Sequence, residues 1–253
     1  MKSIPLLLKG PLVRRSLDGR KRMTRRLVTS LAGIGPVREF QRSTTQGYDW
    51  TFRRKDGCWC DITPAELMAA CPYGTAGDEL WGRETFRPEE LASGLDGYRF
   101  KADNAFVPIA DTEQAMQAWI AAKASQRGNT WRPAIFMPRE ACRLVMNITE
   151  VRLERLQAIT DADIQAEGVA DLTLDELLEM GATRSNILKT TQSVLPRIGG
   201  YDWLLVNVMW PQSFTMQERF QILWDLIYGA DPATCWDGNP WVWVISYKRQ
   251  VTT

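Results

Sequence analysis

The expected fold depends on one stretch of sequence, CRLVMNITEVRL at residues 142–153. Apolar and polar side chains alternate from Cys142 to Ile148, which predicts a strand with one buried face. The apolar positions then move from even to odd numbers, starting at Val151. One extra residue near positions 149–150, a β-bulge, would explain this shift, and bulges are common where a sheet curls into a barrel.

Further short strands and several helices are expected on both sides of this stretch. The expected strands cover residues 4–8, 22–29, 48–53, 58–62, 79–86, 98–101, 105–109 and 241–247. The expected helices cover residues 11–19, 112–125, 160–168, 173–181 and 215–229. Three of them begin at a threonine followed three residues later by an acid, a capping pattern. Residues 183–212 show no regular period and are expected to be irregular. This mixture predicts an α+β fold, a small barrel that carries large insertions.

The composition excludes several classes of function. The chain of 253 residues has 31 Lys and Arg against 30 Asp and Glu, so it has no overall basic field for nucleic acid. A local basic patch lies within residues 13–26. The absence of histidine excludes Ser-His-Asp and Cys-His nucleophiles and any histidine-ligated metal. A general base must therefore be Asp, Glu, Lys, Tyr or Cys.

The cysteines and tryptophans favour ordinary structural roles. Five cysteines, an odd number, do not form a disulfide framework, and we expect reduced thiols. Cys58, Cys60 and Cys71 are the alternative, a zinc site, but the usual ligand spacing does not occur twice. The eleven tryptophans are expected mainly in the core, with a few left to stack on bases.

No segment is expected to enter a membrane or to direct secretion. The apolar run near the start is too short for a signal peptide, and no stretch is long enough to span a bilayer. We therefore expect a cytoplasmic protein without a membrane partner. No cofactor or metal is expected, and the sequence leaves the oligomeric state open.

Lys21 and Thr24 are the first candidates for chemistry. They lie in the run GRKRMTRR at residues 19–26, and an amine near a hydroxyl could act as a base and a nucleophile. The neighbouring arginines crowd the amine with like charge, which favours its neutral form. Residues three apart face opposite ways on a regular strand, so the pair needs a turn or a bulge. The alternative is a solvated basic run.

Glu167 is the candidate acid. It falls in the last turn of the helix expected over 160–168, where the helix dipole disfavours a carboxylate. A residue placed against its local electrostatics is a candidate for function or for pairing with a cation such as Lys21. The alternative is an exposed glutamate at a helix end.

Three further candidates for substrate binding lie in the strand expected over 79–86. Glu84 shares an apolar face of that strand, which predicts a half-buried acid. Arg83 and Trp81 offer a flat cation and a flat ring for a base or a phosphate. An internal ion pair is the alternative explanation for the charged residues.

Several segments together resemble the ASCH family, which has a PUA-like β-barrel, and in particular the large ASCH proteins of tailed phages and prophages. The resemblance rests on GRKRMTRR at 19–26, CPYG at 71–74, GDELWGRET at 77–85, MPR at 137–139, ACR at 141–143, VRLERL at 151–156 running on to Glu167-Gly168, and Trp224-Asp225 with NPWVWV at 239–244. These pieces span nearly the whole chain. The resemblance implies one elaborated ASCH domain over residues 1–253, with flanking helices. Its core segments would be about 1–29, 76–86, 136–168 and 213–250, and its insertions about 33–75, 87–135 and 171–212.

The resemblance also implies a chemistry. Small bacterial ASCH enzymes hydrolyse the amide of N4-acetylcytidine with a lysine, a threonine three residues later and a distant glutamate. By that likeness Thr24 is the nucleophile, Lys21 activates it, and Glu167 orients the lysine or handles protons. Arg20 matches the arginine that precedes the family's lysine and is expected in substrate binding.

Three functions follow from this reading. The first is an amidohydrolase acting on an N-acylated nucleobase or nucleoside, in the bacterial host cytoplasm if the chain is phage-encoded. The second is a module that binds RNA or a modified base without cleaving it. The third is a phage assembly or host-interaction factor that uses its insertions as partner surface.

Overall fold

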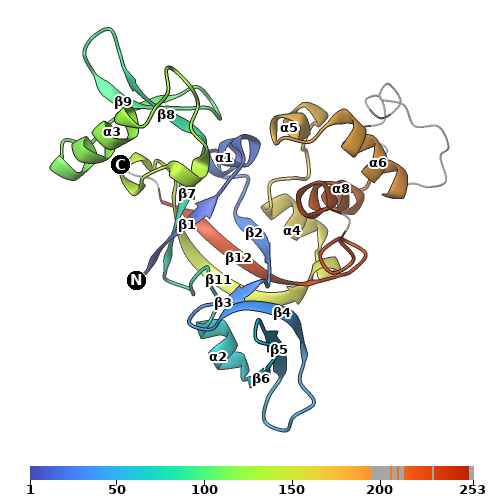
Figure 1. The fold of residues 1–253 in the computed structure, drawn as a ribbon. Helices are drawn as coiled ribbons and strands as arrows, with labels where there is room; N and C mark the ends of the chain where they lie inside the picture. The colour runs from blue at the N-terminus through green and yellow to red at the C-terminus, as the bar shows by residue number, and fades with distance from the viewer. Residues whose placement is uncertain (195–205, 207–209, 211–213, 230, 251–253) are drawn as a thin grey trace.

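A five-stranded sheet forms the centre of the computed structural model, which describes residues 1–194, 206, 210, 214–229 and 231–250 (Figure 1). The strands follow the order β1-β7-β11-β12-β2. Their bounds are Ser3–Leu7 for β1, Glu79–Arg83 for β7, Val145–Arg155 for β11, Trp241–Arg249 for β12 and Met23–Leu27 for β2. β1 pairs with β7 in parallel, and the other neighbours are antiparallel.

The longest strand, β11, contains the expected bulge. Its pairing with β12 shifts register between Ile148 and Glu150, which confirms the prediction. The strand begins at Val145, three residues later than expected, because the short 3₁₀ helix η2 at Arg139–Ala141 precedes it. The α+β class is confirmed. Within the described residues β1 and β2 remain the two edges of the sheet, so it is not closed into a barrel.

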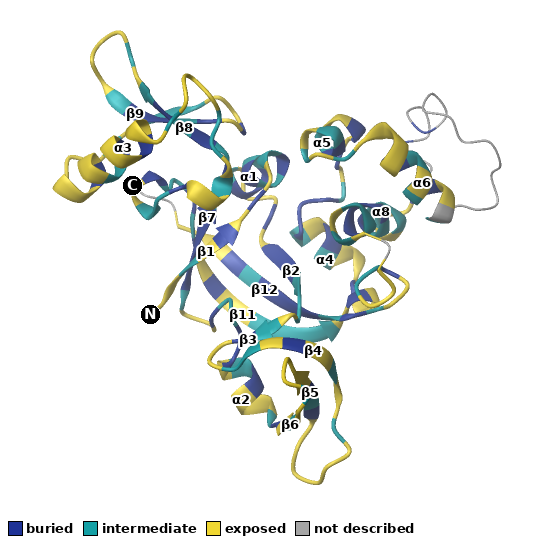
Figure 2. Cartoon of the chain, in the orientation of Figure 1, coloured by how far each residue is buried: buried dark blue, intermediate teal, exposed yellow. Residues whose placement is uncertain are grey.

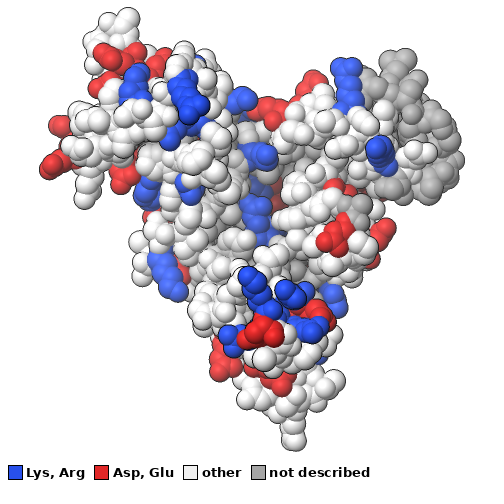
Figure 3. All heavy atoms as spheres, in the orientation of Figure 1, with Lys and Arg blue, Asp and Glu red and all other residues white. Residues whose placement is uncertain are grey.

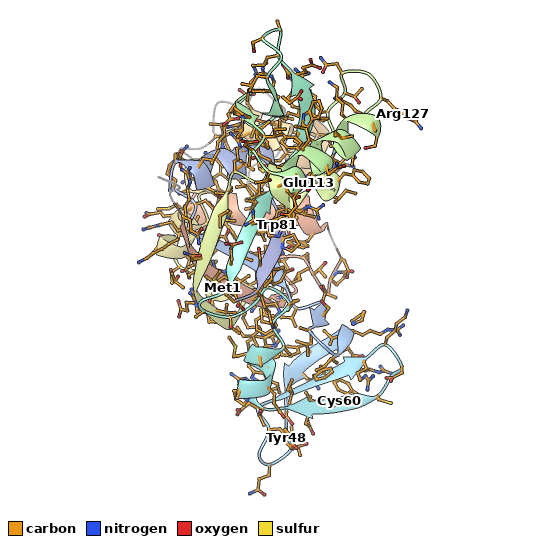
Figure 4. The ribbon with its side chains drawn as sticks, turned by 90° about the vertical axis from the view of Figure 1, so that its left-hand side faces the viewer. Met1, Tyr48, Cys60, Trp81, Glu113 and Arg127 are labelled. Atoms are coloured by element: carbon orange, nitrogen blue, oxygen red, sulfur yellow. The ribbon has the colours of Figure 1, made fainter. Side chains whose placement is uncertain are left out.

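Two smaller sheets project from the central one (Figure 1). The first contains β3 (Ser30–Leu31), β4 (Gly35–Arg42), β5 (Trp50–Arg54) and β6 (Trp59–Ile62), and α2 (Pro64–Ala69) follows it. The second contains β8 (Phe86–Glu90), β9 (Asp96–Phe100) and β10 (Phe106–Pro108), and α3 (Glu113–Ala124) packs on it. Figure 4 shows Tyr48 and Cys60 in one unit, Glu113 and Arg127 in the other, and Trp81 between them.

The expected hairpins of both small sheets are confirmed, but the strand expected over 79–86 is wrong as a single element. It ends at Arg83 in the central sheet, and Phe86 begins β8 of the small one. Phe86 is fully buried beside Tyr98 at a ring distance of 5.8 Å. Burial of this ring in a separate cluster explains why the chain leaves the central sheet.

Helices pack against both faces of the central sheet. Their bounds are Gly10–Leu17 for α1, Asp161–Ala166 for α4, Leu174–Glu179 for α5, Arg184–Val194 for α6 and Met216–Tyr228 for α8, with 3₁₀ turns η1 at Ala134–Phe136 and η3 at Leu156–Ala158. The expected capping boxes before α4, α5 and α8 are confirmed. The irregular structure expected over 183–212 is wrong for α6, whose Ile187 is fully buried. Most of the rest of that range lies outside the described residues.

β12 is buried on both faces, as its apolar sequence predicts. Val242 and Val244 pack in a cluster with α4, α5, α6 and α8, whereas Trp243 and Ile245 pack in a second cluster with α1, α2 and β5 (Figure 2). Successive side chains of a strand point to opposite faces, so β12 separates two cores. In the described part of the chain, no helix has the length and apolar character needed to cross a bilayer.

A buried ion pair fixes the start of the second small sheet. Glu84 is 2% exposed and accepts hydrogen bonds from Arg143 at 2.7 and 2.9 Å. Arg143 also binds Asp103 at 2.7 Å and lies 4.2 Å from the ring of Phe100. Burial raises the pKa of the Glu84 carboxyl, although Arg143 opposes the shift.

Replacing Arg143 with methionine is expected to lower the free energy of unfolding by about 3–5 kcal/mol near neutral pH, because Glu84 loses its partner while buried. The folded-state pKa of Glu84 lies above its ordinary value, so the folded state holds an extra proton and stability falls as the pH rises through that window. The loss of unfolding free energy in Arg143→Met, measured by urea unfolding, should therefore be smaller at about pH 5 than at about pH 8.

The matched control is Arg53→Met, because Arg53 pairs with Glu39 at 2.9 Å with both side chains largely exposed. This variant should change stability little at any pH, since exposed ion pairs contribute little. An Arg143→Met loss that is the same at every pH would contradict the assignment to Glu84.

Candidate functional site

The structure brings Lys21 and Glu167 together at the junction of β2 and α4, although 146 positions separate them. Lys21 Nζ lies 2.8 Å from Glu167 Oε2, and the two side chains are 2% and 7% exposed. Backbone bonds dock the segment: Lys21 N donates to Arg15 O at 2.8 Å, and Arg22 N donates to Ala166 O at 2.7 Å. The position of the pair is therefore set by main-chain contacts on both sides.

The Lys21 amine has three acceptors. It donates to Met23 O at 2.7 Å, Glu167 O at 3.0 Å and Glu167 Oε2 at 2.8 Å. Burial lowers the pKa of Lys21 below its ordinary value, Glu167 opposes this, and Arg26 and Arg25 add to the lowering. The acceptors suit an ammonium, but the burial penalty outweighs them, so the neutral amine forms at a lower pH than in an exposed lysine.

Thr24 lies beside this pair. It is 3% exposed in β2, and the carbonyl of the preceding Met23 accepts the bond from Lys21. Lys21 itself precedes β2, which begins at Met23, so the rule that residues three apart face opposite ways does not separate them. Lys21, Thr24 and Glu167 are all lining residues of one pocket.

That pocket has a volume of about 40 Å³, room for roughly three water molecules at about 10–15 Å³ each. Its other lining residues come from α1, the rest of β2, residue 169 and α8: Leu12, Arg25, Arg26, Val169, Phe220, Leu223, Trp224, Ile227 and Tyr228. Figure 3 shows Lys and Arg atoms gathered in the hollow between the α1 side and the α4–α8 side.

Sequence reasoning missed the α8 wall. The helical spacing of Phe220, Leu223, Trp224 and Ile227 predicts the helix but does not say which strand it faces. In the structure the ring of Trp224 lies 4.2 Å from that of Tyr228 and 6.1 Å from that of Phe220, so the three form a continuous row along α8, with Phe220 and Trp224 buried. An excess of large rings on one face of a helix was the available signal.

One oxygen of Glu167 has no hydrogen bond. Oε1 is buried and unpartnered, and Arg25 Nη1 lies 3.7 Å from it. This is too long for a hydrogen bond. An unpaired buried acceptor costs about 1–3 kcal/mol, so a donor that enters the pocket would gain a partner there.

The other expected substrate-binding residues do not line this pocket. Arg20 is half exposed and pairs with Asp18 and Asp171, both at 2.7 Å. Trp81 and Arg83 lie on β7, and β11 and β12 separate that strand from β2. Arg83 lies 5.3 Å over the Trp81 ring and donates to the carbonyl of Ile135. Glu84 forms the internal pair with Arg143 described above.

No metal site is found in the part of the chain that the structure describes. All five cysteines are free thiols, and burial raises the pKa of Cys71 to about 11, so it is a poor metal ligand at neutral pH. Cys58 is exposed and Cys71 is buried in the second core.

Comparison of the chain with models of protein families, with curated proteins and with solved structures found no match. The function is therefore argued from the geometry of the pocket.

Gly168, next to Glu167, has a left-handed backbone with φ of +70°. An added Cβ would lie 2.9 Å from Lys21 Cβ and 3.2 Å from Lys21 Cα. The variant Gly168→Ala is expected to lose about 1–2 kcal/mol for the left-handed conformation, and more for displacing Lys21. Urea unfolding measures the total.

Gly19→Ala is the matched control, since Gly19 has φ of +82° and nothing lies within 4 Å of its added Cβ. It should carry the conformational cost alone. If Gly168→Ala and Gly19→Ala lose the same free energy of unfolding, the close contact between residue 168 and Lys21 does not destabilise the fold.

Proposed function

We propose that this chain is an amidohydrolase acting on an N-acylated nucleobase or nucleoside of the N4-acetylcytidine type, built on an ASCH-like relative of the PUA barrel. The observation that carries the proposal is the buried Lys21–Glu167 pair in the same pocket as Thr24. Because its pKa is lowered, this amine is neutral over a wider pH range than an exposed lysine, which suits it to accept a proton from a hydroxyl.

In the proposed reaction, Thr24 Oγ1 attacks the acyl carbonyl and its proton passes to Lys21 Nζ. The C–N bond then breaks, and the leaving nitrogen takes that proton. Water next attacks the acyl-threonine ester and loses a proton to Lys21, which releases the acid and restores the hydroxyl. Glu167 holds Lys21 Nζ at 2.8 Å and stabilises the ammonium that forms in each half of the cycle.

The free oxygen of Glu167 supports an amide with an N–H as the substrate. Oε1 is the unpaired acceptor in the pocket, and a secondary amide carries a donor next to the carbonyl that Thr24 attacks. The size of the pocket supports a short acyl group in the enclosed part, since about 40 Å³ suits a few heavy atoms. Phe220 and Trp224 are buried in the lining, and the partly exposed ring of Tyr228 next to them then offers a surface for the flat base.

A second candidate, base or RNA binding without cleavage, is favoured by the charges of the lining. The lining holds three cations, Lys21, Arg25 and Arg26, against one carboxylate, Glu167, which favours anionic ligands even though Asp163 and Glu154 already pair with Arg25. In that case affinity should fall steeply with salt and stepwise as arginines are removed.

The decisive experiment incubates the purified protein with N4-acetylcytidine and follows cytidine by chromatography. Lys21→Met and Thr24→Val should each lower turnover by about 10²–10⁴-fold, the usual share of a general base or nucleophile. Thr24→Ser keeps a hydroxyl and should retain part of the activity. Thr29→Val, an exposed threonine just beyond β2, should behave as wild type.

N4-acetyl-N4-methylcytidine tests the role of the amide N–H. It lacks the donor, so Glu167 Oε1 stays unpaired, and its hydrolysis should be at least about 10-fold slower, from the cost of one unmet buried acceptor. If N4-acetylcytidine releases no cytidine and the methylated compound releases no N4-methylcytidine, the hydrolase is rejected and the binding module is left.

A further inference from the structure

We propose that Arg25 is a positioning residue: Asp163 in the first turn of α4 holds its guanidinium at 2.8 Å, which keeps it 3.7 Å from Glu167 at the other end and leaves the Glu167 carboxylate to Lys21. Its consequence for turnover rests on the proposed function. The positioning itself does not, because the state of Lys21 can be measured without a substrate.

The guanidinium of Arg25 is surrounded by carboxylates. The side chain is 1% exposed, and Nη2 lies 2.8 Å from Asp163 Oδ2 and 3.3 Å from Glu154 Oε2. Nη1 lies 3.7 Å from Glu167 Oε1 and 3.4 Å from the sulfur of Met23. Three carboxylates from α4 and β11 therefore converge on one buried cation.

Two of these carboxylates belong to the same short helix. Asp163 is in the first turn of α4, where it closes the capping box with Thr160, and Glu167 is the C-cap. Residues four apart lie on the same helical face, so both carboxylates can face Arg25. A helix of six residues is too short to be stable alone, so its position depends on contacts at both ends.

The distances show which carboxylate pairs with which cation, Arg25 or Lys21. Asp163 holds Arg25 at 2.8 Å, which leaves the guanidinium 3.7 Å from Glu167, beyond hydrogen-bond range. Glu167 is thereby free to bind Lys21 at 2.8 Å. Without Asp163, Arg25 could move onto Glu167 Oε1 and compete for the charge that Lys21 uses.

Charged and titratable groups face Lys21 from four elements, α4, β2, α1 and β12. Glu167 of α4 favours the ammonium, whereas Arg25 and Arg26 of β2 disfavour it. On α1, Arg15 provides the backbone carbonyl that binds Lys21 N, and its side chain pairs with Glu176. On β12, the hydroxyl of Tyr247 is buried and its pKa is raised by burial, so it is neutral.

Arg152 supplies a matched control. Its Nη2 lies 3.1 Å from Asp163 Oδ1 and it also pairs with Glu154 and Glu150, so it belongs to the same network. Within the described residues it forms no hydrogen bond or ion pair with Glu167 or Lys21. A general loss of stability should appear in both Arg25→Met and Arg152→Met. A shift in the titration of Lys21 should appear only in Arg25→Met.

The experiment follows the ¹³Cε and ¹Hε resonances of labelled lysines against pH, with the Lys21 signal assigned by its absence in Lys21→Met. In wild type Lys21 should titrate below the ordinary lysine value of about 10.4. Arg25→Met removes a like charge and should shift the Lys21 titration to higher pH. Asp163→Asn frees Arg25 to approach Glu167, and should shift it to lower pH. Arg152→Met should leave it close to wild type.

Opposite shifts from two variants of one ion pair distinguish positioning from loss of structure, since local unfolding would expose Lys21 in both and raise its pKa in both. The amide oxygen introduced by Asp163→Asn can still accept the capping bond from the backbone N–H of Thr160. That variant therefore keeps α4 even if Arg25→Met fails to fold. An unchanged or raised Lys21 titration in Asp163→Asn would overturn the proposal.

Turnover of N4-acetylcytidine gives the second readout. A misplacement of Glu167 by about 1 Å should lower kcat about 100-fold in Arg25→Met, with the pH profile of kcat moved in the same direction as the Lys21 titration. If wild type shows no hydrolysis while the two opposite NMR shifts appear, Arg25 still positions Glu167 and only the proposed function fails.

Discussion

A buried lysine is the constraint on which the rest of this structure depends. A charged or neutral amine without partners in a protein interior costs several kcal/mol, so Lys21 must have its acceptors supplied by the fold. Two come from Glu167 and one from the Met23 carbonyl at the start of β2. The C-terminal end of α4 and the edge of the central sheet therefore have to meet. Gly168 allows this meeting, because any side chain at that position would contact Lys21.

The same constraint explains why so many arginines in this region are paired. Arg15, Arg25 and Arg152 join α1, β2 and β11 to the acidic first turns of α4 and α5. Both α4 and α5 begin with a capping box whose acid, Asp163 or Glu176, also accepts a bond from an arginine. One carboxylate thus accepts hydrogen bonds from backbone N–H groups and from a guanidinium. These bonds attach α4 and α5, which are too short to be stable on their own, to the rest of the fold.

Local pattern predicted the parts of this arrangement but not their contacts. The alternation and its shift at residues 149–150 predicted β11 and its bulge, and the threonine caps predicted three helices, because both signals lie within a few residues. The Glu84 and Arg143 pair and the α8 wall depend on elements that meet only in space, so no local period contains them. The helix α6 was missed because its serine, asparagine and threonines are weak helix formers, and burial of Ile187 outweighs that preference.

Lys21 and Glu167 could be named from sequence because each conflicts with its surroundings. A lysine among arginines and a glutamate at the negative end of a helix are both unfavourable locally, and each relieves the other when they meet at 2.8 Å. Trp81 and Arg83 on β7 show no such conflict: the structure pairs them with each other, and Arg83 donates to the backbone carbonyl of Ile135 in η1. Burial lowers the pKa of Lys21, and the like charges of Arg26 and Arg25 add to the lowering. This shift requires the sheet edge and α4 to close around the same side chain.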